Sequence, residues 1–242
     1  MFAILFTWLA KEEPSVAAKP AKHSLQADKM FPTPALWLFF LTACFAFSLR
    51  DFTGNSMGSL GSLFLQKAHH YSWKETGFAL SGIFIASAIS NPLFGHFSDK
   101  SRMRWAGMVL CMAAIVVAVF PHLPQKFLFL ALVVYGFFFV ANYPMIEAAV
   151  MESVPDSVRG RVFGLFITVG GLVGNLSHWL VGKWVQKLGP AASSPSAFFP
   201  IYGCLALLIV LSLIGLPCLH AIRKREHLEA AAAPILPPAA LE

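Results

Sequence analysis

Long apolar stretches alternate with short polar segments along most of this sequence. An apolar run of about 20 residues is long enough to cross the hydrocarbon core of a bilayer as a helix. Such runs occupy residues 35–65, 73–97, 105–120, 127–151, 162–185 and 198–222. The pattern predicts an all-α membrane protein with one six-span domain over residues 35–222.

The segments that flank this domain differ from it in composition. Residues 1–10 are apolar but reach only about half of a spanning length, so they are either an interfacial segment or the end of a helix that begins before this chain. Residues 11–34 hold four prolines and four lysines, which predicts a cytoplasmic linker. We therefore treat residues 1–34, the short apolar segment and the linker, as one region that precedes the six-span domain. The tail over 223–242 is charged at first and then rich in Ala and Pro, which predicts disorder on the cytoplasmic side.

Composition excludes a soluble domain. Hydrophobic residues make up 57% of the chain and charged residues 12%, whereas soluble domains carry about 25% charged residues. The net charge of +6 would suit nucleic acid, but the basic residues lie in short segments between apolar runs. This placement indicates membrane topology, and we predict no nucleic-acid partner.

The distribution of basic residues predicts the orientation in the membrane. Twelve of the 18 lysines and arginines lie in the linker, at 100–104, at 159–161 and in the tail, whereas five lie near the opposite ends of the spans. Basic residues concentrate on the cytoplasmic side of membrane proteins. Both termini are therefore expected in the cytoplasm, in a plasma or inner membrane.

A weak internal similarity links the second and fifth spans. Each ends with a Gly, one residue, an aromatic residue and then a Lys three residues further on, starting at Gly95 and Gly182. These two ends fall on opposite faces of the membrane. An inverted repeat of three plus three spans requires this arrangement.

The loop after the second span carries a recognisable motif. Its pattern is Gly95-x-x-x-Asp99-Lys100-x-Arg102-x-Arg104, which resembles the signature loop of the major facilitator superfamily, although Arg102 stands where that family usually has Gly. The resemblance implies a gate loop formed by these five residues.

A second segment strengthens the resemblance. Residues 154–165 are similar to the loop and helix start before the fifth and eleventh helices of facilitators. Gly160 with Gly164, and Gly170 with Gly174, form pairs that allow close helix packing. Together the resemblance covers residues 35–222 and implies the carboxy-terminal half of a twelve-helix facilitator. In the family, the loop acid of one half docks on the other half, so Asp99 would lack its partner here.

Arg50 and Asp51 have the largest chemical consequence, because a charge inside a span costs roughly 2.5 to 3.5 kcal/mol on insertion scales. Neighbouring helical residues point about 100° apart, so we expect the two to pair poorly. At least one should then face a polar cavity, where Arg50 could hold an anionic group or Asp51 could carry a proton. The alternative is a mutually paired structural couple.

Four more polar side chains complete the predicted substrate site. Asn55 lies among glycines and serines that favour local bending of the first span. Tyr135 and Asn142 are seven residues apart on one helix face, next to a kink expected at Pro144. His178 lies in the fifth span and could relay a proton. Packing and interhelical hydrogen bonding are the alternative roles for these residues.

Familiar catalytic motifs are missing from the sequence. There is no phosphate-binding loop, no Gly-x-Ser-x-Gly and no His-Glu-x-x-His, so we predict no enzymatic activity, no cofactor and no metal site. The predicted function is secondary active transport of a small solute by alternating access. The partners would be the bilayer, the solute with or without a coupling proton, and a second six-helix half or a homodimer partner. The alternative is a six-span membrane protein without transport activity.

Overall fold

The computed structural model describes residues 30–99 and 101–232, without the side chains of 226–232, and this part of the chain is helical throughout, with no strand. The α-helices are α2 (Pro34–Ala68), α3 (Trp73–Ser98), α4 (Arg102–Val119), α5 (Leu128–Phe139), α6 (Asn142–Glu152), α7 (Asp156–Leu188), α8 (Phe199–Ser212) and α9 (Gly215–Ala232). Short 3₁₀ helices η1 (Phe120–His122), η2 (Gln125–Phe127), η3 (Gly189–Ser193) and η4 (Pro195–Phe198) connect them. Residues 1–29, Lys100 and 233–242, on which several sequence predictions fall, lie outside the described residues.

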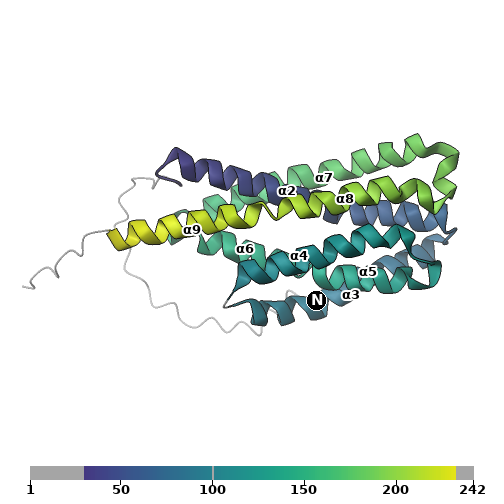
Figure 1. Ribbon diagram of the computed structural model, residues 1–242, viewed down its shortest axis with the longest axis horizontal. Helices are drawn as coiled ribbons and strands as arrows, with labels where there is room; N and C mark the ends of the chain where they lie inside the picture. The colour runs from purple at the N-terminus through teal and green to yellow at the C-terminus, as the bar shows by residue number, and fades with distance from the viewer. Residues whose placement is uncertain (1–29, 100, 233–242) are drawn as a thin grey trace, which may run out of the picture.

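Six segments are long and apolar enough to cross a membrane, as predicted. The helices α2, α3, α4 and α7 each form one span, whereas α5 with α6 and α8 with α9 form the fourth and sixth. Figure 1 shows the helices side by side along the long axis of one bundle. The start of α2, the α3–α4 connection and the end of α9 lie at the same end of this bundle (Figure 1).

Proline explains the two spans that are interrupted. The fourth span breaks at Val140 and Ala141, and the sixth breaks at Leu213 and Ile214. A helical proline lacks an N–H group, and its ring meets the carbonyl of the residue four positions earlier. Val140 and Leu213 lie four residues before Pro144 and Pro217, so the kink expected near Pro144 is present.

Helix α3 begins with a complete capping box. The Ser72 hydroxyl accepts a hydrogen bond from the Glu75 amide at 3.3 Å, and the Glu75 carboxylate accepts one from the Ser72 amide at 2.8 Å. These bonds satisfy two of the amides that a helix start leaves free. They fix the turn by which the chain re-enters the bundle after α2.

The helix contacts have the symmetry of an inverted repeat. The most extensive contacts join α2 with α7 and α3 with α5, and α4 packs on α8 between them. An inverted repeat relates the first, second and third spans to the fourth, fifth and sixth. Under this relation the contact of α2 with α7 corresponds to the contact of α5 with α3. The fold is therefore the expected all-α arrangement of six spans in a three-plus-three repeat.

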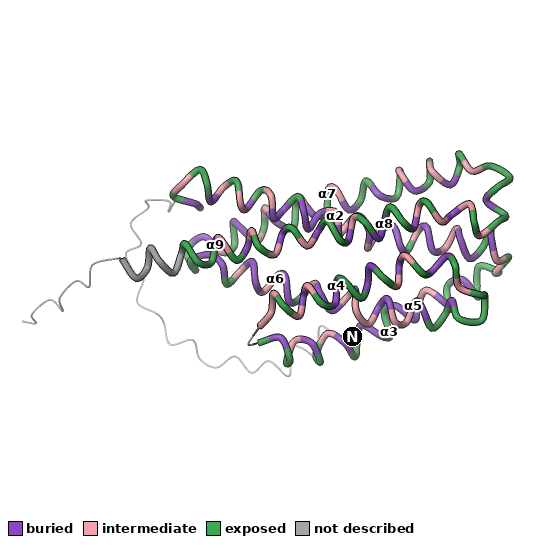
Figure 2. The backbone as a smooth tube through the Cα atoms, viewed as in Figure 1, coloured by how far each residue is buried: buried purple, intermediate pink, exposed green. Residues whose placement is uncertain are grey.

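The α3–α5 contact depends on a position without a side chain. A Cβ on Gly136 of α5 would collide with the backbone of Ile83 in α3. Only Gly allows two helix backbones to approach this closely. Along the helices, buried and exposed positions alternate (Figure 2), and every span keeps an exposed face.

Three boundaries differ most from the sequence prediction. The fifth span begins at Asp156 rather than at Val162. The third span begins at Arg102 rather than at Trp105. The helix of the sixth span continues past its expected end at Ile222, because α9 extends to Ala232. The charged residues at the start of the predicted tail do not stop the helix, since Lys, Arg and Glu have good helix propensity.

Candidate functional site

A buried ion pair lies at the midpoint of α2. Arg50 is 1% exposed. Its Nε and Nη2 atoms donate hydrogen bonds to Oδ1 of Asp51 at 3.0 and 2.7 Å, and Nη1 donates to Oδ1 of Asn142 at 2.9 Å. The ring of Tyr143 faces the guanidinium, with 4.3 Å from Cζ to the ring centroid. These contacts offset the free energy that is lost when the cation leaves water.

This geometry corrects one expectation. We predicted that Arg50 and Asp51, as helix neighbours, would pair poorly, yet they form a salt bridge of 2.7 Å. The Arg side chain is long enough to bend back over the angle that separates the two positions. The alternative of a mutually paired couple is therefore what the structure contains, and Asn142 from α6 joins it.

A polar face continues from Asp51 along the contact between α2 and α7. The Asp51 side chain keeps 17% exposure. Its carboxylate lies against Gly170, and the Asn55 amide lies against Gly174, where an added Cβ would stand 2.8 Å from Nδ2. The two glycines thus make room for polar side chains of α2.

The same face reaches His178, one turn further along α7. The His178 Nδ1 atom lies 3.4 Å from the hydroxyl of Ser59 in α2. His178 is exposed, as are Thr168 and Asn175 on the same helix. The described part of the chain therefore presents polar side chains on an exposed face of α7, near the middle of the fifth span.

Tyr135 does not join this face. It is 1% exposed and its ring stacks on Phe139 with 4.8 Å between the centroids. The hydroxyl of Tyr135 has no hydrogen-bond partner among the described residues, and the same holds for Tyr202 of α8. Among the six predicted substrate residues, the structure thus brings together Arg50, Asp51 and Asn142, and places Asn55 and His178 further along the α2–α7 face.

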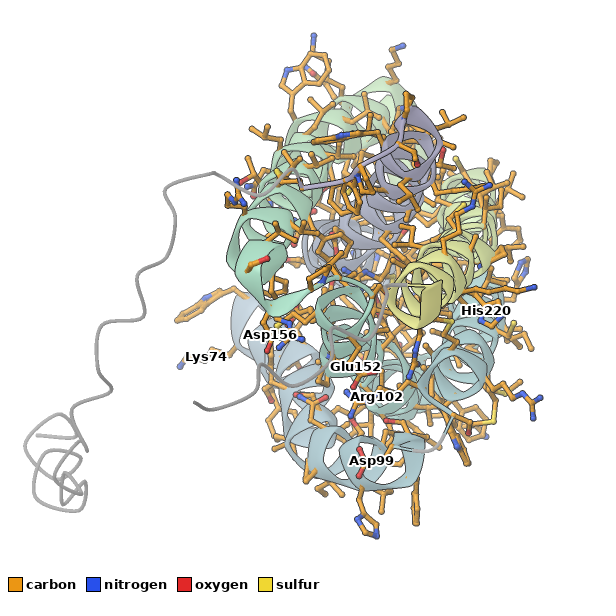
Figure 3. All side chains as sticks on the ribbon, turned by 90° about the vertical axis from the view of Figure 1, so that its left-hand side faces the viewer. Lys74, Asp99, Arg102, Glu152, Asp156 and His220 are labelled. Atoms are coloured by element: carbon orange, nitrogen blue, oxygen red, sulfur yellow. The ribbon has the colours of Figure 1, made fainter. Side chains whose placement is uncertain are left out.

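Ion pairs join the predicted gate loop to two other helices. Arg102 pairs with Asp99 at 3.2 Å and with Glu152, the last residue of α6, at 3.2 Å. Arg223 of α9 lies 3.9 Å from the other carboxylate oxygen of Glu152. Figure 3 shows Asp99, Arg102 and Glu152 close together at this end of the bundle. Gly95 precedes this network in α3, and Arg104 follows it in α4 without joining it.

The predicted glycine pairs separate into two environments. Gly170 and Gly174 face α2 as described above, but Gly160 and Gly164 have open space where a Cβ would stand. Gly160 and Gly164 therefore pack against no other helix of the described chain. Nearby, in the first turn of α7, Arg159 pairs with Asp156 at 2.5 Å.

A metal centre has no support in this part of the molecule. Among the residues that the structure describes, no three or more His, Cys, Asp or Glu side chains gather in a way that could hold an ion.

Comparison with known proteins identifies the family. The family model for the Major Facilitator Superfamily matches residues 1–178. The chain belongs to the major facilitator superfamily. It is therefore an integral membrane protein of a solute-transport family, in contact with the lipid bilayer.

Two curated facilitators are similar to the chain. The lysosomal dipeptide transporter MFSD1 of Mus musculus is 24% identical over 210 residues, which cover 84% of this chain and 41% of that protein. The lactose permease of Citrobacter freundii is 28% identical over 138 residues, which cover 49% of this chain and 33% of the permease. The chain thus matches less than half of the length of either relative. No solved structure matches it significantly.

Some contacts of the site could not be anticipated from the sequence. Tyr143 follows Asn142 directly, and a helical neighbour would be expected to point elsewhere, yet both reach Arg50. The sequence did not predict the ion pairs of Glu152, because its only notable feature is its position just before a loop. Asn142 and Tyr143 directly follow the break at Val140 and Ala141, and the kink expected near Pro144 is the one feature of the sequence that could have drawn attention to both.

Proposed function

We propose that the chain acts as one half of a secondary transporter that moves a small solute by alternating access. The observation that carries this proposal is the charged pair at the midpoint of α2, continued by the polar face on α2 and α7. Ionisable groups at this depth are expensive and mark substrate or ion pathways in membrane proteins. Facilitator membership supports the same activity.

The proposal includes a second six-helix unit opposite this face. The Asn175 amide and the second ring nitrogen of His178 would be costly to expose to hydrocarbon, because they would lose hydrogen bonds to water. A second unit would cover them and close the solute pathway. It could be a separate half, a second copy of this chain, or another part of a longer protein.

The pairing of Arg50 limits how a solute can bind. An anionic group that reached Arg50 would have to compete with Asp51, and removing one partner from a buried pair costs about 3 to 5 kcal/mol. A solute with both an ammonium and a carboxylate group could exchange with both members, leaving neither charge unpaired. We therefore favour a zwitterionic solute, a class that includes dipeptides, over a simple anion. Protonation of Asp51 is the coupling step that this arrangement would allow.

An uptake assay on vesicles that carry the chain with its native partner tests the proposal. The panel is a dipeptide, an organic anion of similar size and a neutral disaccharide. Asp51→Asn should abolish dipeptide uptake, because the ammonium group would lose its partner. Glu75→Gln makes the same chemical change at the exposed capping box, which Gln maintains, and should leave uptake intact.

The outcome also decides between transport and its alternative. Disaccharide uptake that Asp51→Asn leaves unchanged would remove the charged pair from the solute site. Vesicles that carry none of the three solutes, with the chain correctly inserted, would favour a six-span protein with an assembly or regulatory role. The closed pairing of Arg50 is the observation that keeps this second function in consideration.

The gate loop and the orientation belong to the same proposal. Asp99, Arg102, Glu152 and Arg223 would hold one conformation of the gate, because breaking their ion pairs would free α6 and α9 at this end. Both termini would lie in the cytoplasm of a plasma or inner membrane, as the distribution of basic residues favours.

A further inference from the structure

A shallow groove lies between the start of α4 and the first turns of α9. Met103, Arg104, Leu216, Pro217 and His220 line it, and its volume is about 270 Å³. The floor is tight, because a Cβ on Gly107 would stand 3.3 Å from the Leu216 side chain. The groove lies on the outer surface of the bundle, apart from the α2–α7 face.

The groove is basic and has no acidic partner among the described side chains. Arg104 and His220 form no ion pair or hydrogen bond with any residue that the structure describes, and Lys224 follows His220 by one helical turn. The acids at this end are engaged elsewhere: Asp99 and Glu152 pair with Arg102. In Figure 3 His220 points out of the bundle, away from these three residues.

Below the basic residues the surface becomes apolar. Met108 and Met112 follow Arg104 at intervals of four residues on α4, so they share its face, and they are 41% and 38% exposed. The surface therefore passes from cationic at the helix start to apolar toward the middle of the span. A phospholipid has the same order of groups, with a phosphate at the interface and acyl chains below it.

We infer that this groove binds the headgroup of an anionic phospholipid. The Arg104 guanidinium offers paired donors to a phosphate, and His220 and Lys224 add two donors from the opposite helix. In the orientation proposed above, the groove lies at the cytoplasmic interface, where basic pockets between spans suit the anionic lipids of that leaflet. Such a lipid would link α4 to α9, and this role does not depend on the identity of the transported solute.

Native mass spectrometry of the full chain in neutral detergent tests the site. Phosphatidylglycerol and phosphatidylcholine with identical acyl chains are titrated, and phosphatidylglycerol should bind at about one-tenth of the concentration that phosphatidylcholine needs. Arg104→Gln and Lys224→Gln should each weaken phosphatidylglycerol binding severalfold. Arg225→Gln is the matched control, because Arg225 lies on another face of α9, 5.9 Å from the ring centroid of Phe39.

The alternative outcomes each overturn the inference. Equal binding of the two lipids would show that the groove does not select lipids by the charge of the headgroup. Equal weakening by Arg225→Gln and Arg104→Gln would indicate diffuse attraction by the whole basic end. Displacement of the lipid by inorganic phosphate at a similar concentration would mean an anion site rather than a lipid site. Circular dichroism of each variant verifies that the helices are retained.

Discussion

The contacts of one side chain, Arg50, lower the free-energy cost of placing α2 across the membrane. Arg50 brings a cation to the midpoint of the helix, and Asp51 and Asn142 accept hydrogen bonds from it at 2.7 to 3.0 Å. A buried charge without a partner would be far more expensive than a buried pair. The side chain therefore links α2 to the start of α6, in addition to any part it has in transport.

The first prediction concerns this pair. Arg50→Met should lower the free energy of unfolding by about 3 kcal/mol, at the lower end for breaking a buried pair because Asp51 is partly exposed. The double variant Arg50→Met with Asp51→Leu should recover most of that loss, because it leaves no charge without a partner. Denaturant unfolding in detergent, monitored by circular dichroism, measures both. Equal losses in the single and double variants would show that the pair does not stabilise α2.

A second prediction concerns pH. The pKa of His69, in the α2–α3 connection, is lowered from 6.5, first by burial and then by the charge of His70. Its ring packs edge-on against Phe64, with 4.8 Å between centroids. The unfolded chain therefore binds this proton more readily than the folded chain, so stability should fall as the pH drops below about 6.5.

The measurement is the unfolding midpoint at pH 8 and pH 5. His69→Gln should reduce the difference between the two values, because the titrating group is gone. His70→Asn should reduce the difference less than His69→Gln does, because it removes only the smaller cause of the lowered His69 pKa; Asn tolerates the positive φ of 56° at this position. A pH difference that persists in His69→Gln would assign it to another group.

At the scale of helices, apolar length and proline position predict most of the structure. Six runs of spanning length gave six spans, and Pro144 gave the break in the fourth. The partners of each helix were less accessible, because every span is apolar on several faces and lipid-facing residues resemble packing residues. Gly160 and Gly164 illustrate this limit: their spacing matches that of Gly170 and Gly174, but no neighbouring helix of the chain meets them.

The α3–α5 contact supplies a prediction at this scale. Gly136→Ala should destabilise the bundle by about 1 to 3 kcal/mol, the usual effect of overpacking, even though Ala favours helix by about 1 kcal/mol. Gly58→Ala is the control, because nothing lies within 4 Å of its added Cβ, and it should be neutral or stabilising. The comparison uses denaturant unfolding of both variants. A Gly136→Ala variant as stable as Gly58→Ala would mean that α3 and α5 do not approach this closely.

The whole molecule has one polar face, along α2 and α7, and one charged end, around Asp99. The sequence predicted the charged end but not the polar face. The loop motif around Asp99 indicated a facilitator, and the basic residues indicated an orientation. In the structure, Asp51 and Asn55 of α2 lie on the same face as His178 of α7. This arrangement depends on how α2 and α7 are aligned along their axes, and no local sequence pattern predicts that alignment. The predicted linker over 11–34 remains a prediction.

The gate loop gives the prediction at this scale. Asp99→Ala removes the 3.2 Å ion pair with Arg102 and, by family resemblance, the docking acid for the other half. Membrane insertion should be unaffected, whereas uptake by the assembled transporter should fall at least tenfold. Uptake at the original rate in a fully inserted Asp99→Ala protein would exclude Asp99 from the gate.

The most direct test of the half-transporter account is the protein mass of the complex isolated through this chain from its native membrane. Light scattering corrected for bound detergent measures that mass. The account predicts at least twice the 26.4 kDa of this chain, supplied by a second copy, another chain or a longer parent protein. A uniform complex of 26.4 kDa would contradict it, because the polar face on α2 and α7 would then have no second half to cover it.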